Sequence, residues 1–151
     1  MMRKLALTVS MLLASRAALA ACTVSASGLA FGVYNPTFAT PTDGIGTVTL
    51  SCTSASGTGG YTIALDAGGG GTYAGRRMSN ANSILSYQLY SDPAHSQIWG
   101  DGAGGSSIVT GTDNIPQVGG TSTYQVYGRI VARQAVSPGA YTDVIVVTVT
   151  Y

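Results

Sequence analysis

Apolar and polar residues alternate along five stretches of the chain, at residues 47–52, 61–66, 85–89, 124–130 and 141–151. Successive side chains of a β-strand point to opposite faces, so this period of two predicts strands with one buried face. In the first four stretches the residues expected to face the core are Val48, Leu50, Cys52, Tyr61, Ile63, Leu65, Leu85, Tyr87, Leu89, Tyr124, Val126 and Ile130.

The last stretch is the longest and the most apolar. Its core-facing residues are expected to be Tyr141, Ile145, Val147, Val149 and Tyr151. The opposite face carries further valines at 144 and 146, so we expect that face to be half-buried as well.

Turn-forming clusters separate these stretches, among them Asn35-Pro36, residues 100–105 and Pro138-Gly139. Glycine, proline, asparagine and aspartate favour the backbone conformations of tight turns. Short strands joined by such turns, without any amphipathic helical window, predict one all-β antiparallel sandwich rather than a βαβ sheet.

The first residues have the pattern of a secretory signal peptide. Arg3 and Lys4 precede an apolar run from Leu5 to Leu13, and a small-residue cleavage signal ends at Ala20. We therefore expect residues 1–20 to be removed and residues 21–151 to form one exported domain. The apolar run is too short for a transmembrane segment.

Charge limits the classes of partner. Without the leader, the chain carries four arginines against six aspartates, a net charge of −2, and it has neither lysine nor glutamate. No nucleic acid is expected as a partner, because binding phosphates requires a positive surface.

The two cysteines, Cys22 and Cys52, are expected to form one disulfide, since exported proteins fold under oxidising conditions. An alternative stays open at this point. The sequence before Cys22 resembles a lipoprotein cleavage box, in which Cys22 would be lipidated and the protein anchored to a membrane surface.

Candidate chemistry is sparse, and neither an enzyme activity nor a cofactor or metal is expected. His95, the single histidine, lies beside a turn and is expected to be an exposed loop residue. The glycines of residues 100–105 match a dinucleotide fingerprint, but a strand-like run follows in place of the required helix. A calcium loop at Asp101 would have a single carboxylate. Arg76-Arg77 is expected to start a strand, with one arginine covering the sandwich edge by its aliphatic stem.

The chain has nine tyrosines. Tyr61, Tyr87 and Tyr124 lie on apolar faces and are expected in the core. Candidates for an exposed contact surface, such as a lectin would use, are Tyr34, Tyr73, Tyr90 and Tyr127.

Several segments, in order, resemble the spore coat protein U domain. They are Cys22-Thr23-Val24, residues 28–34, residues 48–52, Arg77-Met78, residues 85–90, residues 99–102, residues 126–130 and residues 139–151. Their order and spacing from Cys22 to the last residue are specific to this domain.

This resemblance implies a structural subunit of a secreted surface fibre, of the archaic chaperone–usher (Csu-type) pili that serve adhesion and biofilm formation. Such subunits are immunoglobulin-like antiparallel β-sandwiches that lack their last strand. A periplasmic chaperone first lends the missing strand, an usher assembles the fibre, and another pilus subunit later supplies its own strand. The resemblance implies that Ile145, Val147, Val149 and Tyr151 line the acceptor groove.

One departure is notable, since only Ala21 separates the expected cleavage site from Cys22. Polymerising subunits carry a donor segment there, so we expect a tip or initiating position, or a coat component. The protein is expected to pass through the periplasm to the cell surface. The alternative is a stand-alone secreted binding module, a lectin-like adhesin whose sandwich is complete without a partner.

Overall fold

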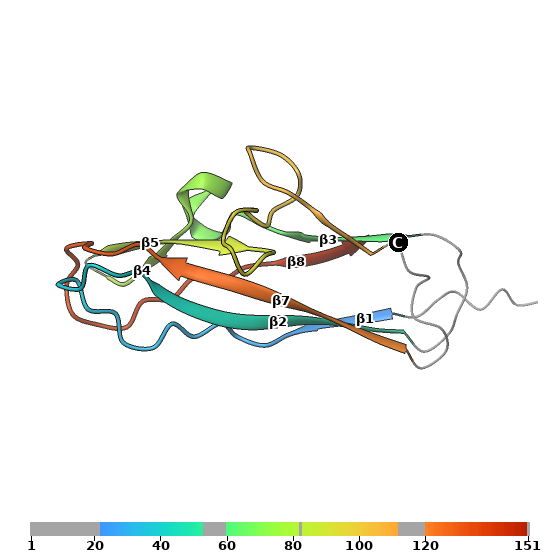
Figure 1. Ribbon diagram of the computed structural model, residues 1–151, viewed down its shortest axis with the longest axis horizontal. Coiled ribbons are helices and arrows are strands. Elements are labelled where there is room, and N and C mark those ends of the chain that lie inside the picture. Colours follow the sequence, from blue (N-terminus) through green and yellow to red (C-terminus); the bar gives the residue numbers. More distant parts are fainter. Residues whose placement is uncertain (1–21, 53–59, 82, 112–119, 151) are drawn as a thin grey trace, which may run out of the picture.

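The computed structural model describes residues 22–52, 60–81, 83–111 and 120–150. These residues form two antiparallel β-sheets that face each other (Figure 1). The strands are β1 (Cys22–Ala26), β2 (Thr42–Cys52), β3 (Tyr61–Leu65), β4 (Arg77–Ser79), β5 (Ile84–Tyr90), β6 (Val109–Gly111), β7 (Gly120–Ile130) and β8 (Val147–Thr150). Two short 3₁₀ turns, η1 (Gly68–Gly70) and η2 (Tyr73–Gly75), lie between β3 and β4. Within these ranges no helix is long and apolar enough to cross a membrane.

The larger sheet has the strand order β1-β2-β7-β5-β4. Its centre is the long pair β2–β7, in register from Thr42 opposite Ile130 to Cys52 opposite Gly120. The smaller sheet has the order β6-β3-β8. Within the described part of the chain, β8 pairs in this sheet with β3 alone, with Val149 opposite Ile63.

The core lies between the two sheets and contains most of the residues that alternation predicts, together with Met78 and Trp99; Tyr124, expected in the core, is half-buried against it. Val48, Leu50, Ile63, Leu65 and Ile130 are at most 2% exposed. Most strand boundaries fall within a few residues of those predicted, because the alternation marks the extended stretch that has one buried face.

Trp99 is completely buried in this core, and its indole N–H donates to the carbonyl of Ile63 at 2.9 Å. A loop residue thus fills the centre of the sandwich.

The C-terminal stretch differs from its prediction in two respects. Only Val147–Thr150 is a regular strand, and residues 141–146 are extended with a single bridge between Thr142 and Ser79. The second face was expected to be half-buried, but this was wrong, since Val144 is 78% and Val146 is 55% exposed. These valines point away from the core and no described segment covers them.

Cys22 and Cys52 form the predicted disulfide, which joins the first residue of β1 to the last residue of β2. The bond occupies the sulfur that a lipid would need. The lipid-anchored alternative is therefore wrong for the molecule described here.

Candidate strand-acceptor groove

One wall of a groove is formed by the end of β1 and the residues that follow it. Ser27 still bonds the edge of β2, donating its backbone N–H to the carbonyl of Thr47 at 2.9 Å. The chain then leaves that edge and passes over the inner face of the larger sheet. Residues 28–33 make no backbone hydrogen bond within the part of the chain that the structure describes.

Glycines on the inner face of β2 and β7 make this path available. Gly44 and Gly128 are opposite each other in the register. A Cβ at Gly44 would lie 2.9 Å from Leu29 Cδ2, and one at Gly128 would lie 2.7 Å from Phe31 Cζ. The missing side chains therefore leave the space that Leu29 and Phe31 fill.

The second wall is the extended segment 141–147, which continues into β8. Thr142 exchanges backbone hydrogen bonds with Ser79, and the carbonyl of Val146 accepts the N–H of Asp66 at 3.0 Å. In an extended chain the backbone groups of successive residues point to opposite edges. The N–H and C=O groups of Ile145 and Val147 therefore point away from the smaller sheet, toward the groove.

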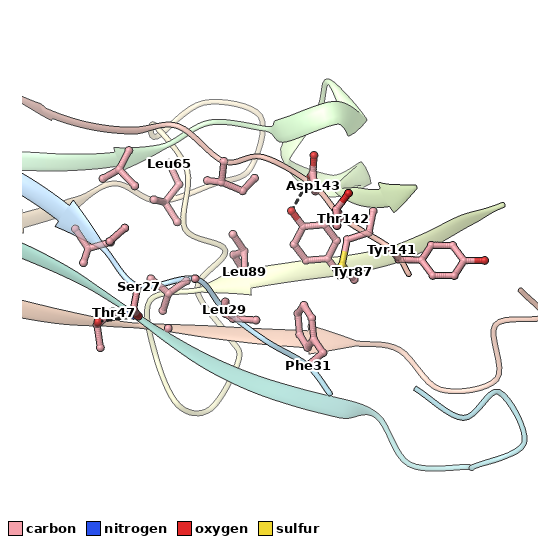
Figure 2. A pocket seen from close by; sticks show the side chains of 18 residues that line it. Ser27, Leu29, Phe31, Thr47, Leu65, Tyr87, Leu89, Tyr141, Thr142 and Asp143 are labelled. Atoms are coloured by element: carbon pink, nitrogen blue, oxygen red, sulfur yellow. Dashed lines mark hydrogen bonds between the residues drawn. The ribbon is translucent and has the colours of Figure 1, made fainter. Parts of the chain in front are cut away.

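Between the walls lies an apolar cavity of about 340 Å³ (Figure 2). Its floor and sides include Leu65, Met78, Leu89 and Val126 from the core, and residues 26–29 and 141–147 from the walls. A second cavity of about 710 Å³ continues between residues 29–36 and 136–141. The two cavities share four lining residues, Leu29, Phe31, Met78 and Tyr141. They therefore form one continuous groove, and these side chains lie at the junction of its two parts.

Two of the four groove residues expected from the sequence line the cavity, namely Ile145 and Val147. Val149 packs against the core but does not line it. Tyr151 lies outside the described residues. The wall of residues 27–31 was not anticipated, although the inward glycines of β2 and β7 are a signal for close approach of another segment.

The groove contains one hydrogen-bonded polar pair. The Tyr87 hydroxyl donates to Asp143 Oδ2 at 2.7 Å. Asp143 Oδ1 accepts the backbone N–H groups of Gly69 and Val144, each at 2.9 Å. Burial, with the neighbouring carboxylate as a second cause, raises the pKa of Tyr87 well above its usual range, so the phenol stays protonated and donating.

Arg76 has a role that differs from its prediction. It does not cover an edge but is 1% exposed inside the fold. Its guanidinium donates to the carbonyls of Asp66 and Trp99, at 2.6 and 2.7 Å, and to Gln88 Oε1 at 2.9 Å. Burial lowers the pKa of Arg76, but these acceptors satisfy its donors.

His95 is also less exposed than expected, with 11% of its side chain accessible. Its ring packs edge-on against Tyr90 at 5.1 Å and Tyr127 at 6.2 Å between centroids. Its Nε2 lies 3.9 Å from Asp43 Oδ1, and the same carboxylate pairs with Arg129 at 2.7 Å. The histidine therefore fastens its loop to the outer face of the larger sheet.

The four tyrosines proposed as a contact surface are all half-buried. Tyr34 binds the loop after β7, donating to the carbonyl of Val131 and accepting the N–H of Gln134. Tyr73 stacks on Arg76 at 5.4 Å. The sequence-based expectation of a free aromatic surface is wrong, because each ring packs on a neighbour within the chain.

The loop of residues 100–105 leads into β6 rather than a helix, as its sequence indicates. Asp101 accepts the backbone N–H of Ala103 at 2.8 Å, which shapes the turn. The described residues contain no group of three or more histidine, cysteine or acidic side chains that could hold a metal ion.

A family model described as the Spore Coat Protein U domain matches residues 8–148. The chain belongs to this family. The resemblance found in the ordered sequence segments is therefore confirmed. No curated protein matches the chain in sequence.

A solved structure agrees with the Spore Coat Protein U assignment. The fold is similar to a chain of the CsuC–CsuE chaperone–tip adhesion subunit pre-assembly complex, from the archaic chaperone–usher Csu pili of Acinetobacter baumannii. The TM-score is 0.60 at 20% identity, over 88% of this chain and 40% of that chain. The protein thus spans less than half the length of that chain, and at this identity the likeness concerns the fold.

Proposed function

We propose that this Spore Coat Protein U domain is a non-enzymatic structural subunit of a surface fibre or coat, completed by a β-strand from another protein. The observation that carries the proposal is the groove, whose two walls carry backbone groups without partners among the described residues. Extended peptides bind such edges by backbone hydrogen bonds, and their alternate side chains enter the apolar floor.

The groove restricts what can enter it. Residues 26–31 lie opposite 141–147, and further along residues 29–36 lie opposite 136–141, so the walls run in opposite directions. An inserted strand is therefore parallel to one wall and antiparallel to the other. A segment of about ten residues, extended over roughly 33 Å, would follow the groove with apolar residues at every second position.

The partners follow from this geometry and from the family. An open apolar groove is an aggregation hazard, so a periplasmic chaperone would cover it after export through the leader at residues 1–20. A neighbouring pilus subunit would then replace the chaperone at the usher, placing the protein in a cell-surface fibre for adhesion and biofilm formation. The similar fold in a chaperone–tip adhesion subunit pre-assembly complex supports a chaperone and pilus subunits as partners. A tip position, or a role in a coat, stays a prediction.

A synthetic peptide tests the proposal directly. We expect a ten-residue peptide with alternating apolar residues to bind the purified domain and to raise its Tm with peptide concentration, because a ligand of the folded state stabilises it by mass action. The control peptide has the same composition, with its apolar residues regrouped so that neither face is apolar.

Equal effects of the two peptides would refute the acceptor groove. So would a monomer that unfolds cooperatively at high temperature and binds neither peptide. That result would favour the stand-alone binding module.

A further inference from the structure

Tyr87 contacts both walls of the groove at once. It belongs to β5 in the larger sheet, and its ring packs edge-to-face on Phe31 of the first wall, with centroids 5.9 Å apart. Its hydroxyl bonds Asp143 of the second wall at 2.7 Å. Figure 2 shows the three side chains in line across the groove.

Both ends of this connection are fixed. Asp143 is held by the backbone N–H groups of Gly69 and Val144, so its carboxylate cannot turn away without breaking other bonds. Phe31 is confined against Gly128, where a single methyl group would already collide with its ring. A contact between two fixed groups sets a distance between the segments that carry them.

The connection lies where the two cavities meet, since Phe31 and Met78 line both. A shift of either wall at this point would change the width of the groove on both sides. Core packing alone would be served equally well by phenylalanine at position 87, because the ring is 7% exposed and only its hydroxyl reaches the second wall.

We propose that Tyr87 is a positioning residue, which braces Phe31 against Asp143 and holds the two walls at the separation that an incoming strand requires. This inference rests on the proposed function. With Tyr87 in place the walls are already ordered before a strand arrives, so less of the binding free energy is spent on ordering them.

The chain offers a matched control in Tyr61. This tyrosine is also buried, packs edge-to-face on Tyr124 with centroids 6.3 Å apart, and shares a hydrogen bond of 2.5 Å with the Tyr124 hydroxyl. That contact also joins the two sheets, from β3 to β7, but neither tyrosine lines the groove. Tyr87→Phe and Tyr61→Phe therefore each remove one buried hydroxyl that links the sheets.

Two measurements compare these variants. The wall residues Ser27, Val144 and Val146 have hydrogen-bonded backbone N–H groups, so their amide exchange reports loosening of the walls. In the partner-free domain their exchange should accelerate in Tyr87→Phe and stay as in the wild type in Tyr61→Phe. The alternating peptide should bind Tyr87→Phe about tenfold more weakly, as expected for one hydrogen bond to a charged acceptor, and Tyr61→Phe with unchanged affinity.

The outcomes separate the two proposals. If the wild type binds no peptide, the acceptor function fails, and exchange alone then decides whether Tyr87 braces the walls. If the peptide binds the wild type and both variants equally, or if both variants loosen the walls alike, the brace is refuted while the groove remains. If Tyr87 only stabilised the core, both variants would be less stable than the wild type, but amide exchange in the two walls would not differ between them.

Discussion

Removing the Cys22–Cys52 disulfide should markedly lower the free energy of unfolding of the domain. The bond closes a loop with a sequence separation of 30. On the chain-entropy model, a cross-link over a loop of that length stabilises the folded state by about 3.7 kcal/mol at 25 °C. That is a large share of the free energy of unfolding of a small domain.

The first strand depends strongly on this bond. Among the residues that the structure describes, β1 pairs only with β2, and all its residues after Cys22 are exposed. Without the disulfide we expect β1 to fray, and the groove wall at residues 27–31 to loosen with it.

Urea unfolding measures the effect, and Trp99 is a suitable probe because it is the only tryptophan and is fully buried. Cys22→Ser/Cys52→Ser is compared with oxidised wild type, and reduced wild type is the control for the new hydroxyl groups. A loss below about 1 kcal/mol, or full exchange protection of β1 in the reduced protein, would contradict the reasoning.

Three further predictions concern single side chains. Arg76→Met should lower the free energy of unfolding in urea by about 3–5 kcal/mol, because buried carbonyls lose their donor. The control Arg77→Met, at an exposed position, should change that free energy by no more than about 0.5 kcal/mol. Equal losses would refute a role for the buried guanidinium. Gly128→Ala should lower the free energy of unfolding by about 1–3 kcal/mol, because the new methyl group collides with Phe31. Recovery of stability in the double variant with Phe31→Leu would locate the strain at this contact, and no recovery would place it elsewhere. The hydrogen-bonded guanidinium of Arg129 holds the pKa of Asp43 below its usual value of 3.8. The ion pair therefore stabilises the fold above pH 3.8, and this stabilisation is lost as the pH falls through the lowered pKa. Asp43→Asn should flatten the acid side of a Tm–pH profile, and an unchanged profile would contradict this.

Much of this architecture follows from local pattern. The alternation in residues 47–52, 61–66, 85–89 and 124–130 predicted four strands and the residues that they bury, because the period of two is a property of the extended backbone itself. The disulfide was also predictable, since the chain has only two cysteines and its first residues have the pattern of an export signal. Neither inference requires knowing which strands are neighbours.

The groove could not be predicted in the same way. Its walls come from residues 26–36 and 136–147, which the pairing of β1 with β2 and of β8 with β3 brings face to face. The tertiary structure also buries Arg76, covers most of the His95 side chain and leaves Val146 exposed. The alternation along a strand predicts which side chains share a face. Whether an edge of that strand is free depends on which other strands pair with it. The tertiary structure alone decides which backbone groups are left without a partner among the described residues, because that depends on the pairing of strands that are distant in the sequence, such as β3 with β8.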